Sequence, residues 1–299
     1  MNTRKGSFTV ALAATAALLA STGAPALGAT HVRSATTATP KLTIKMSGKN
    51  SLAVVGARHF SAGLVDVTLI AGKGEQAFDI VRMHTGYTYA DFKHDFATYS
   101  KTGHSQKPSA QSLHALAHLV HHATFNGGLD SGTGHKTVTG TVTLPQASTY
   151  YLFADAGGPN LSVAPVKLQV SAATGSRTAP AISGTQTATT AKRFTGPVNL
   201  PASGTIAFHN ASTQSPHFMV LQHVKTGTTR KQVIKAFQSN GPGPFLPGTV
   251  GADLLSMGHT LTLDYTLPAG DYAEACFFPD LKTGMPHAFM GMVRIVHLS

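Results

Sequence analysis

The chain repeats one order of segments in its two halves, and this repeat constrains the fold more than any other feature. In the first half, VDVTLIAGKGEQAFDIVRM (65–83) is followed by HTGYTYADFKHDF (84–96). In the second half, GTIAFHNASTQSPHFMVLQ (204–222) is followed by HVKTGTTRKQVIKAF (223–237). Each copy has the pattern of a strand, a turn, a second strand, a TG turn and a short helix. An ordered repeat of this length predicts two related structural units.

The later parts of the two halves also correspond. GHKTVTGTVTLPQASTYYLFAD (134–155) matches GHTLTLDYTLPAGDYAEACFFPD (258–280), and each half ends on an alternating apolar strand. Short alternating strands separated by turn residues are typical of a β-sandwich or barrel. We therefore predict an all-β protein of two β-sandwich domains in tandem, at residues 41–172 and 179–299, joined by a polar linker at 173–178.

Helical spacing interrupts the strands at three places. Each half carries one short helical stretch, at about 88–99 and 228–238, and the first half has an additional helical insertion at about 108–124. The insertion places His114, His118, and His121 or His122 on one helical face. This face could bind a transition metal or respond to pH, or it could simply be the polar side of an amphipathic helix.

The N-terminus has the pattern of a secretory signal peptide. Arg4 and Lys5 precede the apolar run 8–20, and small residues follow, with cleavage after either Ala26 or Ala29. We expect residues 1–29 to be removed and 30–40 to form a disordered lead-in, the alternative being an uncleaved N-terminal anchor. No later segment reaches the ~18 apolar residues of a membrane helix. The sequence thus predicts a secreted or cell-envelope protein with no membrane span after cleavage.

The amino-acid composition limits the classes of function that the chain can have. The formal net charge is +11, but no basic stripe is interleaved with aromatic residues, so we do not expect nucleic-acid binding. The single cysteine, Cys276, can form no internal disulfide. With 16 His and 8 Met in a chain poor in charge, the composition suits ligation of a soft metal.

Three motifs in the second half supply soft-metal donors. Pro216-His217 opens an alternating apolar strand, the segment GDYAEAC (270–276) ends at Cys276, and PHAFMGMV (286–293) leads into the last strand. Together these motifs resemble those of the cupredoxins, the blue-copper fold of plastocyanin, azurin and amicyanin. The resemblance covers the second half from end to end and implies a cupredoxin-like Greek-key sandwich for each half.

The resemblance also implies a type 1 copper site and a role in electron transfer. His217 and His287 would supply imidazoles, Cys276 the thiolate and Met292 the axial thioether, with Met290 as the alternative axial ligand. The partner would be a redox protein or an envelope component. The sequence departs from the family in one respect, since ten residues separate Cys276 from His287 where familiar members have only a few.

Two other interpretations stay open. The same residues could be buried core and turn residues of a metal-free β-sandwich that binds a component of the cell envelope. An enzyme is not expected, because the chain has no H-x-H pair for an oxidase cluster and no G-x-S-x-G elbow. In the first half, the repeat alignment sets Ala77 opposite His217 and Ala154 opposite Cys276, which predicts a copy without copper ligands.

Overall fold

The computed structural model describes residues 38–48, 51–72, 74–103, 108–155, 161–239 and 243–299. By its internal contacts the chain divides into residues 1–34 and 35–299, and every described residue belongs to the second unit. The predicted signal peptide and most of the predicted lead-in lie outside the described residues. None of the described helices is long and apolar enough to cross a membrane.

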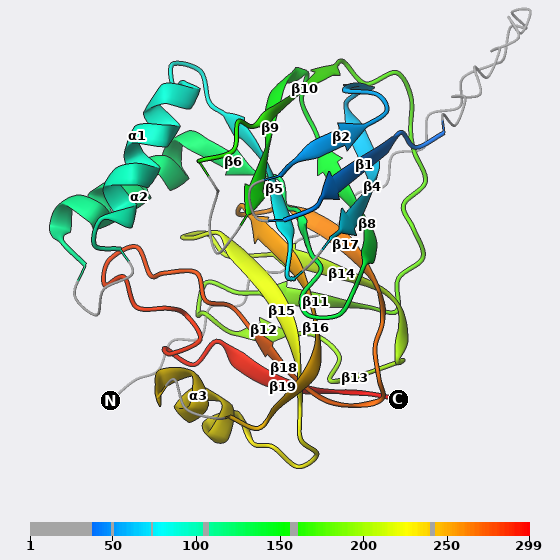
Figure 1. Cartoon of the computed structure of the whole chain (residues 1–299), viewed down its shortest axis with the longest axis vertical. Coiled ribbons are helices and arrows are strands. Elements are labelled where there is room, and N and C mark those ends of the chain that lie inside the picture. Colours follow the sequence, from blue (N-terminus) through cyan, green and yellow to red (C-terminus); the bar gives the residue numbers. More distant parts are fainter. Residues whose placement is uncertain (1–37, 49–50, 73, 104–107, 156–160, 240–242) are drawn as a thin grey trace, which may run out of the picture. The chain divides into compact units, whose positions relative to one another are not determined.

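Two sheets form the framework of the described part of the chain (Figure 1). The smaller sheet consists, in spatial order, of β12 (Phe194–Thr195), β11 (Gly184–Ala188), β14 (Ser203–Asn210), β17 (Thr260–Thr266), β8 (Thr137–Leu144), β4 (Gly63–Ala71), β1 (Lys41–Met46) and β2 (Ala53–Val55). The larger consists of β13 (Asn199–Leu200), β19 (Val293–Leu298), β18 (Gly270–Ala275), β15 (His217–Val224), β16 (Phe245–Leu255), β7 (Leu129–Asp130), β5 (Ala77–Met83), β9 (Ser148–Asp155), β10 (Val166–Ser171) and β3 (His59–Ser61), with β6 (Ala123–Phe125) beside β5. The predicted all-β fold class is confirmed.

The core forms where apolar residues alternate along strands of both sheets. In β4, Val65, Val67 and Leu69 are buried while the residues between them are partly exposed. They belong to one apolar cluster with residues of the larger sheet such as Phe78 and Leu221. Period-two burial of this kind packs one face of a sheet against another layer.

Strand order is the same in both halves when it is counted outward from the seam, the line along which strands of the first half pair with strands of the second. In the smaller sheet, β8-β4-β1-β2 on one side matches β17-β14-β11-β12 on the other, and β8 pairs with β17. In the larger sheet, β7-β5-β9-β10-β3 matches β16-β15-β18-β19-β13, and β7 pairs with β16. Both sheets therefore continue from one half into the other. The division into domains at 41–172 and 179–299 stays a prediction.

Two buried tyrosines fix the correspondence between the halves. The hydroxyl of Tyr150 donates to the carbonyl of Gln146, and the hydroxyl of Tyr272 donates to that of Pro268, four residues upstream in each case. Each is the third residue of its strand, β9 or β18. Counting from them makes Ala154 equivalent to Cys276, as the sequence alignment predicted.

The strand registers correct the other half of that alignment. Val220 pairs with Ala275 in the second half, and Asp79 pairs with Phe153 in the first. Three residues upstream of Val220 and Asp79 lie His217 and Gln76, so the equivalent of His217 is Gln76 and not Ala77. Sequence comparison placed the position one residue off because the turns that precede these strands differ in length.

Three helices lie beside strands of the larger sheet. They are α1 (Tyr89–Ser100), α2 (Ala110–His122) and α3 (Arg230–Ser239), each within two residues of its predicted bounds. Figure 1 shows α1 and α2 side by side with α3 apart from them. Thr88 caps α1 through a reciprocal pair of hydrogen bonds with Asp91. The ring of Phe92 on α1 stacks on Phe153 of β9, and Val233 of α3 is fully buried.

Candidate metal centre

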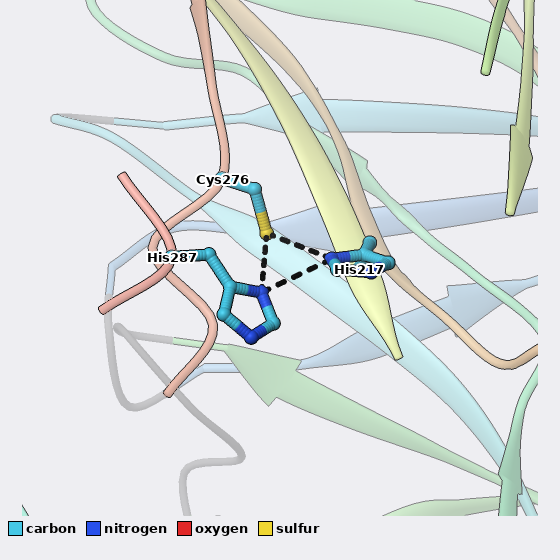
Figure 2. Close-up of side chains that lie close together, drawn as sticks. All are labelled: His217, Cys276 and His287. Carbon is cyan, nitrogen blue, oxygen red and sulfur yellow. Dashed lines mark hydrogen bonds between the residues drawn. The ribbon is translucent and has the colours of Figure 1, made fainter. Parts of the chain in front are cut away.

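His217, Cys276 and His287 point toward one another inside the second half (Figure 2). The Sγ of Cys276 lies 3.6 Å from Nδ1 of His217 and 3.9 Å from Nδ1 of His287. The two Nδ1 atoms are 3.2 Å apart. A metal with bonds of about 2.0–2.3 Å in tetrahedral to trigonal geometry holds its donors roughly 3.2–4 Å from each other. The three donor atoms therefore have the spacing of a three-ligand metal site.

The sheet explains how residues 59 and 70 positions apart meet. His217 is the first residue of β15, and Cys276 directly follows β18. These strands are antiparallel neighbours, with Val220 opposite Ala275, so the start of one lies beside the end of the other. His287 belongs to the loop before β19, which pairs with the other edge of β18.

Burial sets the charge state of the three side chains. All three residues have no exposed surface. Burial, reinforced by the neighbouring His287, lowers the pKa of His217 to about 3, and burial together with Lys192 lowers that of His287 to about 4. Burial raises the pKa of the Cys276 thiol to about 12. Without a cation the site holds two neutral imidazoles and a protonated thiol, so a metal would meet two free nitrogen donors and displace one proton.

Met292 is the buried methionine of the ligand loop, which we define as residues 277–292 between Cys276 and β19. It has no exposed surface, whereas Met290 and Met285 are 36% and 49% exposed. Its backbone N–H donates to the carbonyl of His287 at 2.8 Å, and its carbonyl accepts from the N–H of Cys276 at 3.3 Å. The chain thus holds Met292 directly against both residues, and burial favours it over Met290 as a fourth ligand.

The long interval between Cys276 and His287 folds back on itself. Pro279 and Pro286 form an antiparallel bridge, and the N–H of His287 donates to the carbonyl of Phe278 at 3.0 Å. The intervening residues therefore leave and return at one point, and His287 lies beside a residue only two positions after Cys276. This closed excursion removes the geometric objection raised by the length of the interval.

Further contacts hold residues 279–286 in place. The carboxylate of Asp280 pairs with Nζ of Lys192 at 2.8 Å and accepts from the N–H groups of Lys282 and Thr283. Gly284 adopts φ +69, and a Cβ there would lie 2.4 Å from Pro108, just before α2. The first half therefore contacts the tip of this loop. Sequence reasoning missed both supports, because they join residues far apart in the chain.

We expect Asp280→Ala to lower the free energy of unfolding by about 1–3 kcal/mol, because it removes an acceptor from several partly buried donors. Asp280→Asn is the matched control, since its amide oxygen can still accept from Lys282 and Thr283 while the ion pair with Lys192 is lost. Urea unfolding of the three proteins should rank them wild type, Asn, Ala. Equal stability of the Ala variant and the wild type would show that Asp280 does not hold the loop.

The histidine face predicted on the helical insertion exists on α2. The rings of His118 and His122 lie with their centroids 4.3 Å apart, and His114 stacks on His118 at 6.3 Å. The sequence offered no carboxylate nearby, but Nδ1 of His118 lies 2.7 Å from the carboxylate of Asp95 on α1. Tyr87 donates to the same carboxylate. These contacts link α1 to α2, so the face has a structural role whatever it binds.

Comparison with known proteins gives structural likenesses only. No family model matches, and no curated protein matches the sequence. Solved structures that are similar include auracyanin from Roseiflexus castenholzii (23% identity, 38% of this chain and 94% of that chain, TM-score 0.27) and auracyanin A from Chloroflexus aurantiacus, a "blue" copper protein (17%, 45% and 100%, 0.29). Copper nitrite reductase from Nitrosomonas europaea covers more of the chain (11%, 88% and 94%, 0.24). Because TM-scores of this size do not establish a common fold, only the side chains described above bear on what the site binds.

A second group of potential ligands was not predicted. Asp79, Asp155 and Asp253 bring carboxylate oxygens within 4.8 Å of one another. Nothing in the spacing of these residues indicates a motif. The only sequence signals are a charged residue inside the apolar strand AFDIVRM (77–83) and the general scarcity of acidic residues.

Proposed function

We propose that the protein is an exported, cupredoxin-like copper protein that passes single electrons through one type 1 site. The observation that supports this most directly is the convergence of two imidazole nitrogens and one thiol sulfur at a buried point. Two histidines and one cysteine in a plane, with a weak axial methionine, are the ligand set of blue-copper electron-transfer sites. Bound copper would supply a one-electron couple, since it is stable in two oxidation states.

The residues of this chain would hold copper as follows. His217 and His287 would donate through Nδ1, Cys276 through a thiolate, and Met292 through its thioether. Because the ligands come from two paired strands and a loop that is hydrogen-bonded to Cys276, little rearrangement would accompany a change of oxidation state. Nε2 of His217 lies 3.5 Å from the hydroxyl of Ser215, which could orient the ring from behind.

Electron transfer, and not catalysis, is the activity we propose. The chain lacks the H-x-H pairs that feed an oxidase cluster. A redox partner would dock where the ligand loop reaches the surface, since Met285 and Met290 are exposed there on either side of His287. Export follows from the N-terminal signal pattern, which would place this exchange outside the cytoplasm or at the cell envelope.

The competing function is a metal-free β-sandwich that binds an envelope component. It is favoured by the same burial that makes Cys276, His217 and Met292 resemble ordinary core residues. Two neutral imidazoles facing a thiol at these distances would then be a packing arrangement only. Copper binding decides between the two functions.

Titration of the reduced, mature protein with Cu(II) should produce one intense band near about 600 nm at a stoichiometry of one, as expected of copper bound to a thiolate in this ligand set. Cys276→Ser should abolish the band, and His287→Ala should abolish or strongly shift it. His94→Ala is the matched control, because His94 is an exposed histidine on α1 and should leave the spectrum unchanged.

If neither a band nor stoichiometric copper is found with an intact thiol, the electron-transfer proposal is wrong and the metal-free function stands. A tight site that binds Cu(I) but gives no band with Cu(II) would also reject electron transfer, and would indicate copper handling instead. A band that persists in Cys276→Ser would place the copper elsewhere.

A further inference from the structure

Four adjacent strands of the larger sheet carry aspartates at the seam between the halves. Asp130 of β7 lies opposite Ala77 of β5, and Ala77 lies opposite Asp155 at the end of β9. Asp79 follows Ala77 by two residues, so its side chain is on the same face of the sheet. Asp253 of β16 lies two residues after Gly251, which is paired with Asp130. The aspartates therefore gather on one face although they are far apart in the chain.

The carboxylate oxygens lie close enough together to bind one cation. One oxygen each of Asp79, Asp155 and Asp253 lies within 4.8 Å of the others. Two oxygens bound to one Ca²⁺ ion can lie up to about 4.8 Å apart, twice a bond of roughly 2.4 Å. The three carboxylates can therefore all reach one Ca²⁺ ion.

Asp79 gives a separate indication that a ligand belongs here. Its side chain is 1% exposed, and neither of its carboxylate oxygens has a hydrogen-bond partner among the described residues. The amide of Leu254, which donates to Oδ1 of Asp253 at 2.8 Å, and the carboxyl of Asp155 both lie close enough to influence the pKa of Asp79. A buried carboxylate without a partner is costly, and such groups are normally paired or bound to a metal.

The charged groups described around these aspartates are all acidic. Burial, followed by the charge of Asp155, raises the pKa of Asp79 well above its usual value, and burial, Asp79, Asp155 and Asp130 do the same for Asp253. Burial also raises the pKa of Asp130 to about 7, and Glu75 and Asp155 add to this. The charges acting on these three carboxyls all come from other carboxyls. A chain with 12 acidic residues and a net charge of +11 has gathered five of them here, and no cation is among the described groups that act on Asp79, Asp130 and Asp253.

We propose that Asp79, Asp155 and Asp253 bind one Ca²⁺ ion at the seam, with Asp130 beside it. Ca²⁺ takes six to eight oxygen ligands in flexible geometry, so three carboxylates would be supplemented by water or backbone carbonyls. Asp253 is partly exposed, which gives the ion access from solvent. Because Asp79 and Asp155 belong to the first half and Asp253 to the second, the ion ties the halves together. The site is chemically distinct from the His–Cys group, which offers nitrogen and sulfur.

Calorimetric titration of the EDTA-treated, mature protein with CaCl₂ and with MgCl₂ tests this proposal. We expect one equivalent of Ca²⁺ to bind, more tightly than Mg²⁺, and the melting temperature to rise. Asp253→Asn should weaken Ca²⁺ binding by roughly tenfold or more, as expected when a charged oxygen ligand is lost. Asp66→Asn, in β4 of the other sheet, is the matched control and should bind Ca²⁺ as the wild type does.

The proposal is overturned if the wild-type protein shows neither Ca²⁺ heat nor a change in melting temperature. It is also overturned if Asp253→Asn and Asp66→Asn bind Ca²⁺ equally well. Asp79→Asn is a further variant. If this variant melts at a higher temperature than the wild type, and the wild type binds no Ca²⁺, the aspartates form a protonated carboxyl cluster and the proposal is wrong. Cys276→Ser should bind Ca²⁺ normally, so failure of the copper proposal leaves this test intact.

Discussion

Arg294→Val should destabilise the protein by about 3–5 kcal/mol, because it removes the cation that pairs with the buried Glu274. Glu274 has no exposed surface, and its carboxylate accepts from Nε of Arg294 at 2.8 Å and lies 2.7 Å from Nη2. Burial raises the pKa of Glu274 to about 7 in spite of the arginine, which lowers it. Without Arg294, the charged form would be still less favourable.

The first half of the chain supplies the matched control. Leu152 and Val166 are paired in β9 and β10 at the positions that correspond to Glu274 and Arg294. Glu274→Leu/Arg294→Val therefore copies an apolar pair that the same fold already accommodates. Replacing a buried ion pair by apolar residues is often neutral or stabilising, so the double variant should recover most of the loss.

Urea unfolding of the wild type, the single variant and the double variant measures both effects. Arg58→Met, at an exposed arginine, controls for the loss of one positive charge. A single variant as stable as the wild type would mean that Glu274 is solvated or already neutral, and would contradict the ion-pair argument. A double variant no better than the single would show that the site needs Arg294 for its contact with Gly196.

The candidate copper ligands could be predicted because their chemistry is visible in local motifs. His217 opens a strand, Cys276 directly follows one, and His287 precedes the last strand, so each residue type is marked by its neighbours. What could not be predicted is how His287 returns. The Pro279–Pro286 bridge and the Lys192–Asp280 ion pair depend on tertiary contacts. The number of residues between Cys276 and His287 was therefore a misleading guide to where His287 lies.

The fold could be predicted where apolar residues recur in the sequence at the spacing of a strand or a helix. Alternating strands and helical spacing fixed the all-β class and the three helices. The seam was not predictable, because nothing in β8 or β17 indicates that their exposed edges pair with each other. For the same reason the aspartate group was missed, since Asp79, Asp155 and Asp253 meet only when β5, β9 and β16 are placed in one sheet.

Without Ca²⁺ the protein should lose stability as the pH rises from about 4 to about 7, the reverse of ordinary acid denaturation. The pKa of Asp130 is about 7 in the folded protein against a usual value of 3.8, and burial is the main cause. Between these values the folded state keeps a proton that the unfolded state has released. The stabilisation is therefore complete below about pH 4 and is lost as the pH rises through 7. For Asp130 alone it amounts to on the order of 4 kcal/mol, at about 1.4 kcal/mol per pH unit.

The groups that face Asp130 act in the same direction. They are Glu75, Asp155 and Asp253, and no cation offsets them in the interactions described for Asp130. Urea unfolding in EDTA at pH 5 and pH 8 should show the fall, and Asp130→Asn should reduce it. Glu274 contributes equally to both proteins, so the difference between them isolates the seam. Saturating Ca²⁺ should flatten the profile, because the ion replaces the protons as the counter-charge. A stability in EDTA that rises from pH 5 to pH 8 would mean that these carboxyls are already compensated, and it would remove the electrostatic reason for a cation at the seam.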